Sequence, residues 1–74
     1  MQWRKASGFD ARRLTHTARH EGFAFKVTRY ERINGQFILS PFYHAYIDND
    51  YLGYAATADA AKLICVLNYE DMLR

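Results

Sequence analysis

The chain has 74 residues, of which half are hydrophobic and 16% aromatic, and this apolar content excludes a disordered polypeptide. The formal net charge of +2 excludes an acidic mimic of DNA, and the single cysteine, Cys65, excludes an internal disulfide or a zinc site built on several thiolates. The basic N-terminus has no apolar stretch of a signal peptide behind it and no run approaches the ~20 apolar residues of a membrane span, so we expect a cytoplasmic protein without membrane contact.

Residues 1–9 form an N-terminal segment, and residues 10–21 are predicted to be a helix. Asp10 is placed to cap the first turn, and Gly22 is typical of the left-handed residue that ends a helix. A narrow apolar stripe at helical spacing supports this interpretation: it comprises Ala11, Leu14 and Ala18.

Two strands are predicted at residues 23–33 and 36–47, because both are rich in aromatic and β-branched residues. The dipeptide Asn34-Gly35 between them tolerates the positive backbone angles of a tight turn and is the clearest hairpin signal in the chain. Pro41 cannot donate to a strand ladder, so we expect a bulge, an edge position or a break there.

A third strand is predicted at residues 51–55, after a turn in Asp48-Asn49-Asp50. If Asn49 and Asp50 form the turn, Ile47 and Ala45 lie opposite Leu52 and Tyr54 on one side of the sheet. The other side then carries the aromatic residues Phe42, His44, Tyr46 and Tyr51.

A second helix is predicted at residues 58–73, with Thr57 as its N-cap and Asp59 in the first turn. Its apolar stripe is expected to comprise Ala60, Leu63, Ile64 and Leu67. Cys65 lies beside this stripe, which predicts a buried and unreactive thiol.

The predicted order is therefore helix, three antiparallel strands, helix (αβββα), an α+β fold with one domain over residues 1–74. An unpaired edge strand and a surplus of aromatic residues leave a homodimer open.

No catalytic constellation, cofactor motif or metal site is predicted, and we do not expect an enzyme. His16 and His20 would share a helix face, but zinc needs further ligands and the glutamate of the metalloprotease pattern is missing. Ser7 and Ser40 are the only serines, and neither lies in a nucleophile motif.

The charge is unevenly distributed along the chain. Residues 1–32 carry eight lysines and arginines against three carboxylates, whereas residues 33–74 carry two against five. Arg12 and Arg13 would lie in the first turn of the predicted helix, where the helix dipole disfavours a positive charge by ~0.3–1 kcal/mol. A partner with negative charge would explain them, although a solvated face is the alternative.

The six tyrosines are the second candidate, because a tyrosine ring is apolar and its hydroxyl stays hydrated, which suits an interface. Some of them must fill the core. Together, the basic and aromatic residues predicted to bind a partner are Arg12, Arg13, His16, Arg19, Lys26, Arg29, Tyr46 and Tyr51.

The predicted order of elements resembles the double-stranded-RNA-binding domain, and the stretch GYAATADAAK at residues 53–62 resembles the entry to the second helix of that family. Thr57, Ala61 and Lys62 match its capping, small and lysine positions. Ala58 and Asp59 stand where that family has the lysines that grip phosphate, so the resemblance does not imply RNA binding at those positions.

Two further resemblances are broader. Leu52-Gly53 followed by Thr57 and Ala60-Ala61 resembles the step from sheet to helix in integrase arm-binding domains. In size and aromatic content the chain is similar to small accessory proteins of phages and mobile elements, including anti-CRISPR inhibitors. We therefore predict a non-catalytic binding module, of the phage inhibitor or regulator type, that occludes a larger protein or ribonucleoprotein. The alternative is a nucleic-acid-binding domain that uses the basic helix and the sheet aromatics.

Overall fold

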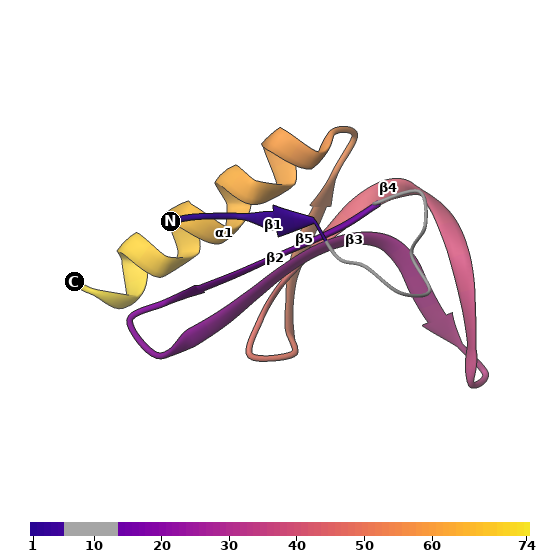
Figure 1. The fold of residues 1–74 in the computed structure, drawn as a ribbon, viewed down its shortest axis with the longest axis horizontal. Helices are drawn as coiled ribbons and strands as arrows, with labels where there is room; N and C mark the ends of the chain where they lie inside the picture. The colour runs from indigo at the N-terminus through magenta and orange to yellow at the C-terminus, as the bar shows by residue number, and fades with distance from the viewer. Residues whose placement is uncertain (6–13) are drawn as a thin grey trace.

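The computed structural model describes residues 1–5 and 14–74, which form a curved antiparallel sheet and one helix (Figure 1). The sheet has five strands, and strands adjacent in sequence are adjacent in space, in the order β1-β2-β3-β4-β5. The helix follows the last strand and packs against β3, β4 and β5. The elements are β1 (Arg4–Lys5), β2 (Thr15–His20), β3 (Phe23–Ile33), β4 (Gln36–Ile47), β5 (Asp50–Ala55) and α1 (Ala58–Met72).

The αβββα prediction is wrong, because residues 15–20 of the predicted first helix form strand β2. Residues 10–13 of that helix lie outside the described residues. All six residues of β2 pair with β3, and the buried hydroxyls of Thr15 and Thr28 lie 2.7 Å apart across the two strands. His16, Ala18 and His20 alternate toward α1, so the pattern of these residues is compatible with a strand as well as with the predicted helix. The unpaired edge of β3 favours the strand, because its backbone groups need hydrogen-bond partners.

Three two-residue turns join the long strands, and both residues of each turn have positive φ. They are Glu21-Gly22, Asn34-Gly35 and Asp48-Asn49. Positive φ at both central positions is the geometry of the tight hairpin turn whose twist matches that of the strands. The predicted Asn34-Gly35 turn is confirmed, whereas Gly22 closes a hairpin and does not end a helix.

The last turn lies one residue earlier than predicted, and this changes which residues of β4 and β5 pair with each other. With Asp48 and Asn49 in the turn, Ile47 pairs with Asp50 and Tyr46 pairs with Tyr51. A register shift after Ala45 then places Tyr54 opposite His44. Tyr54 therefore lies beside His44 and not beside Ala45.

The expected irregularity near Pro41 is present where β3 and β4 change register. Thr28 pairs with His44, but Tyr30 pairs with Leu39, so that residues 40–43 lie opposite Arg29 alone. Side chains replace the missing ladder bonds: the Thr28 hydroxyl accepts from the Tyr30 amide and the Ser40 hydroxyl from the Phe42 amide, both at 3.1 Å. The far half of the hairpin bends away from α1 (Figure 1).

Helix α1 begins as predicted, because the hydroxyl of the N-cap Thr57 accepts from the Ala60 amide at 3.1 Å. Its buried face differs from the predicted stripe: Ala61, Cys65 and Tyr69 point into the core, whereas Leu63 and Leu67 are exposed. The sheet offers a shallow surface lined by Ala18, Ala45 and Val27, and small residues at positions 61 and 65 let the helix approach it closely.

Aromatic rings complete the helix-covered face of the sheet. Phe25 is 1% exposed and meets Trp3 and Tyr69 edge-on, with ring centroids 6.5 and 5.8 Å away. His20 and Phe23 also meet the Tyr69 ring, at 5.2 and 6.0 Å. The C-terminal half of α1 is thereby anchored to β2 and β3 through one tyrosine.

Candidate binding face

The opposite side of the sheet, here called the open face, carries the residues that alternate with the core. In β3, Phe25 and Val27 point toward α1, so Lys26 between them points away from it. Residues paired across neighbouring strands share a face, which places Tyr46 and Tyr51 on the same side as Lys26. No element in residues 1–5 or 14–74 packs on this side in the way that α1 packs on the other.

A single row of paired residues crosses the open face from one edge strand to the other. Arg4 pairs with Thr17, Thr17 with Lys26, Lys26 with Tyr46, and Tyr46 with Tyr51. With strands about 4.8 Å apart, this transverse row is about 19 Å long. Its members on β1 and β3 are the cations Arg4 and Lys26, its member on β2 is the neutral Thr17, and its members on β4 and β5 are tyrosines.

Ring contacts extend the aromatic end of the transverse row along β4 and β5. The centroids of Tyr46 and Tyr51 lie 5.4 Å apart, those of Tyr51 and His44 5.7 Å, and those of His44 and Tyr54 6.2 Å. Phe42 continues the series at 5.1 Å from Tyr54. At the other end the Lys26 ammonium lies 4.7 Å from the Tyr46 ring centroid, a cation–π contact that links the cations to the rings.

His44 holds the exposed ring of Tyr51 from beneath. Its own ring is buried, and its Nδ1 lies 2.9 Å from the Tyr51 hydroxyl. Its Nε2 lies 2.9 Å from the Ser40 hydroxyl and 3.4 Å from a carboxylate oxygen of Glu31. The hydrogen bond between Nδ1 and the Tyr51 hydroxyl holds the orientation of the Tyr51 ring, although the residue is 54% exposed.

The Ser40–His44 pair has the distance of a nucleophile and its base, but its other contacts show a different use. Ser40 is buried, and its hydroxyl already accepts from the Phe42 amide. Glu31 contacts the same Nε2 that a base would need free. The cluster therefore positions the Tyr51 ring and stabilises the bulge in β4.

The phenols of Tyr46 and Tyr51 on the open face stay protonated at neutral pH. Burial raises the pKa of Tyr46, and the nearby charge of Glu31 raises it further. The pKa of Tyr51 is also raised, first by burial and then by the charges of Tyr46 and Glu31. Both hydroxyls can therefore donate a hydrogen bond, and neither adds negative charge to the face.

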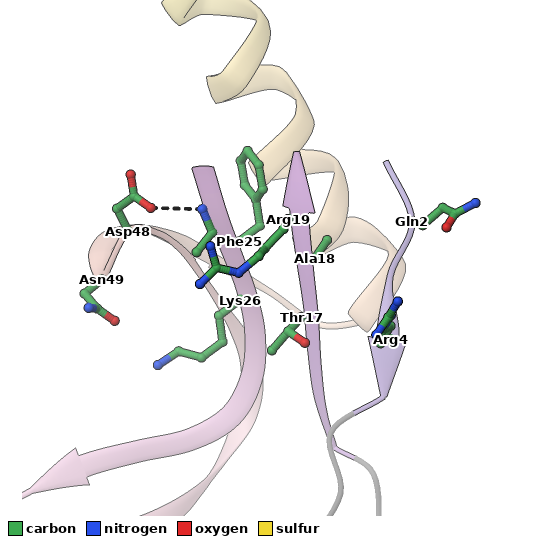
Figure 2. Close-up of a pocket in the computed structure, with 10 residues that line it drawn as sticks. Gln2, Arg4, Thr17, Ala18, Arg19, Phe25, Lys26, Asp48 and Asn49 are labelled. Carbon is green, nitrogen blue, oxygen red and sulfur yellow. Dashed lines mark hydrogen bonds between the residues drawn. The ribbon is translucent and has the colours of Figure 1, made fainter. Parts of the chain in front are cut away.

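A cleft of about 680 Å³ lies beside the aromatic rings, between β1, β2, β3 and the β4–β5 turn (Figure 2). Arg4, Arg19 and Lys26 contribute positive charge to its lining, and Arg4 and Arg19 form no ion pair among the described residues. The carboxylate of Asp48 lies at the rim of the cleft. Its Oδ1 accepts a hydrogen bond from the Ala24 amide at 2.9 Å, which leaves fewer lone pairs to contact the cations of the cleft.

The structure brings together four of the eight residues predicted to bind a partner. Arg19, Lys26, Tyr46 and Tyr51 lie on the open face. Arg12 and Arg13 lie outside the described residues.

His16 and Arg29 lie elsewhere. His16 points toward the helix side, where its ring is buried 6.5 Å from the Tyr43 ring. Arg29 sits at the β3 bulge, where its Nε donates to the Ser40 carbonyl at 2.9 Å and its guanidinium stacks 5.8 Å from the Tyr43 centroid. These contacts give Arg29 a structural role in the bulge.

Sequence reasoning missed Arg4 and Tyr54 and did not assign a role to His44. Arg4 lies in a two-residue strand that carries no pattern of its own. Tyr54, 60% exposed, was assigned to the wrong side by the one-residue error in the turn. The alternation of His44 with Tyr46 was visible, but the contact with Tyr51 depends on the register.

The structure also bears on metal binding and on membrane insertion. His16 and His20 lie in a strand, where four residues span about 13 Å, so the closeness of a helical pair is lost. In the described part of the chain, no three His, Cys, Asp or Glu side chains gather into a group that could hold a metal ion. No helix formed by the described residues has the length and apolar character needed to cross a membrane.

Comparison with known proteins found no matching family model, no matching curated protein and no matching solved structure. The helix–strands–helix order that carried the resemblance to the double-stranded-RNA-binding domain is contradicted by strand β2. The similarity to small phage accessory proteins stays a prediction.

Proposed function

We propose that the protein is a non-catalytic binding module that covers a surface of a larger protein or ribonucleoprotein with its open face. The transverse row from Arg4 to Tyr51 carries this proposal, because it places cations and half-exposed rings side by side on the uncovered side of the sheet. Rigid tyrosines lose little entropy on binding and are typical of interface hot spots. The predicted phage inhibitor or regulator is one form such a module would take.

The energetic argument rests on the preorganised rings. Tyr51 is held by His44, and Tyr54 is packed between His44 and Phe42. Exposing such rings to water without a partner costs apolar solvation free energy of about 25 cal/mol per Å². A partner that covers them recovers this free energy while paying little to order them.

Affinity capture with matched variants tests the proposal. We expect the immobilised protein to retain its partner, and the double variant Tyr51→Ala/Tyr54→Ala to lose it. The control is Leu63→Ala/Leu67→Ala, which removes two equally exposed apolar side chains from α1 and should keep the partner. Loss of the partner by the helix variant and retention by the open-face variant would overturn the proposal.

The predicted homodimer has one observation in its favour. The far half of the β3–β4 hairpin exposes four apolar side chains, Ile33, Phe37, Ile38 and Leu39. Sedimentation of the wild type and of Phe37→Ser over a range of concentrations tests it: a dimer formed there would weaken in the variant, whereas a monomer at all concentrations contradicts it.

A further inference from the structure

We infer that the open face binds single-stranded nucleic acid, with bases stacked on Tyr51, Tyr46 and Tyr54 and phosphates held by Lys26, Arg19 and Arg4. This inference rests on the proposed function, because it names the component that the open face contacts. The two ends of the transverse row match the two halves of a nucleotide: flat rings for the base and cations for the phosphate.

Charge complementarity is the first argument for this partner. Arg4 and Lys26 of the row and the neighbouring Arg19 come from three adjacent strands, and all three line one cleft (Figure 2). Arg4 and Arg19 have no carboxylate partner among the described residues, and Lys26 contacts a ring and not a carboxylate. An arginine that is not in an ion pair can bind two oxygens of one phosphate with two parallel N–H groups.

The exposed rings are the second argument, and they favour a single strand over a duplex. Stacking on a protein ring requires an unpaired base, because the faces of bases in a duplex are already covered by their neighbours. Tyr51 and Tyr54 are more than half exposed, and His44 holds Tyr51 from below, so a ring face is available to a base.

The uneven distribution of charge across the sheet predicts the orientation of the bound nucleic acid. The described residues of β1 to β3 and their turn carry six lysines and arginines against Glu21 and Glu31, whereas residues 33–74 carry two against five carboxylates. A nucleic-acid strand that crosses the transverse row, parallel to the β-strands, would therefore keep its phosphates toward β1 and β2 and its bases toward β5. Glu31, beside His44, lies on the side of the bases.

Fluorescence anisotropy with labelled 12-nucleotide oligo(U) and oligo(dT), and with a 12-base-pair duplex, tests the inference. We expect both single strands to bind more tightly than the duplex. Three phosphate contacts predict a loss of about twentyfold in affinity between 50 and 200 mM salt, from a slope of about 0.7 per contact. Equal binding of single strand and duplex would overturn the inference, since it would show charge without stacking.

Variants of the row separate stacking from charge. Tyr51→Leu should weaken binding at least about fivefold, whereas Tyr51→Phe, which keeps the ring, should retain most of the affinity. Lys26→Gln should weaken binding and flatten the salt dependence. The matched control is Arg74→Gln, which removes the same charge from the end of the chain and should have no effect, because Arg74 lies beyond α1.

The outcomes distinguish this inference from the proposed function. If no oligonucleotide binds although the open-face variants still lose their partner in affinity capture, the partner surface is protein and the inference is wrong. If the open-face variants keep their partner, the proposed function is itself wrong. Thermal unfolding of each variant shows that it is folded, and Lys26→Gln provides the test if Tyr51→Leu does not fold.

Discussion

The two faces of the sheet use the same residue types for opposite purposes. On the covered face, Phe25 of the sheet and Tyr69 of α1 are buried, and their rings meet edge-on between the sheet and the helix. On the open face, Tyr51 and Tyr54 are more than half exposed, and the contact that fixes Tyr51 is a hydrogen bond to His44. The aromatic residues therefore form two sets: one is buried and stabilises the fold, and the other is exposed and kept in position by neighbouring side chains.

The difference between the two faces shows how a small protein can expose aromatic rings and still fix their orientation. A sheet with a helix on only one side leaves its second face to side chains that support one another. Here Ser40, in the β4 bulge, and Glu31 contact His44, and His44 contacts Tyr51. These polar contacts fix the orientation of the exposed Tyr51 ring.

The largest expected difference between the faces is in stability. Phe25→Ala should lower the free energy of unfolding by about 3–5 kcal/mol, because it removes a buried ring and leaves a cavity. Tyr54→Ala on the open face should cost less than about 1 kcal/mol. Urea unfolding measures both. If Phe25→Ala does not fold, Phe25→Leu gives a smaller loss in the same direction, and equal costs on the two faces would refute the division.

The covered face should contribute to the dependence of stability on alkaline pH through the Cys65 thiol. Burial raises the pKa of the Cys65 thiol to about 11, whereas an unfolded thiol ionises near 9.0. The stabilising contribution is fully present below pH 9 and is lost as the pH rises toward 11, by about 2–3 kcal/mol. The pKa values of Tyr46, Tyr51 and Tyr69 are raised as well, so the thiol contribution is the difference between the wild type and Cys65→Ala. Identical pH profiles for the two proteins would contradict it.

The N-terminus of α1 offers a smaller change that acts on the covered face alone. Thr57→Ala removes the hydroxyl that accepts from the Ala60 amide and should cost about 1 kcal/mol. Thr57→Ser keeps the acceptor and should be nearly neutral. Thermal unfolding distinguishes the two variants, and equal midpoints for them would show that the cap contributes nothing.

The smallest expected effect tests which side of α1 is buried. Leu67→Ala should cost less than about 1 kcal/mol, because half of that side chain is exposed. The stripe predicted from the sequence would instead make Leu67 a core residue, for which the cost would be about 2–5 kcal/mol. Chemical unfolding of this variant beside Ala61→Ser, on the buried side, decides between them.

The sequence by itself determined the elements whose signals are local. Strands β3 to β5 and helix α1 lie within one residue of their predicted bounds, because turn residues such as Asn34-Gly35 and the cap at Thr57 act over three or four residues. For the candidate site, charge identified Lys26 as a candidate, and the strand pattern placed Tyr46 and Tyr51 on the side of the sheet opposite Ala45.

Only the tertiary structure decided the rest. Residues 15–20 fit a helix or a strand by their own pattern, and the free edge of β3 selected the strand because its unpaired amides and carbonyls needed partners. The positions of Tyr54 and of the buried stripe of α1 depend on a register one residue different from the local expectation and on how closely a helix can approach the sheet. The transverse row joins residues 47 positions apart in sequence, from Arg4 to Tyr51, and pairing distant strands is what no local pattern can specify.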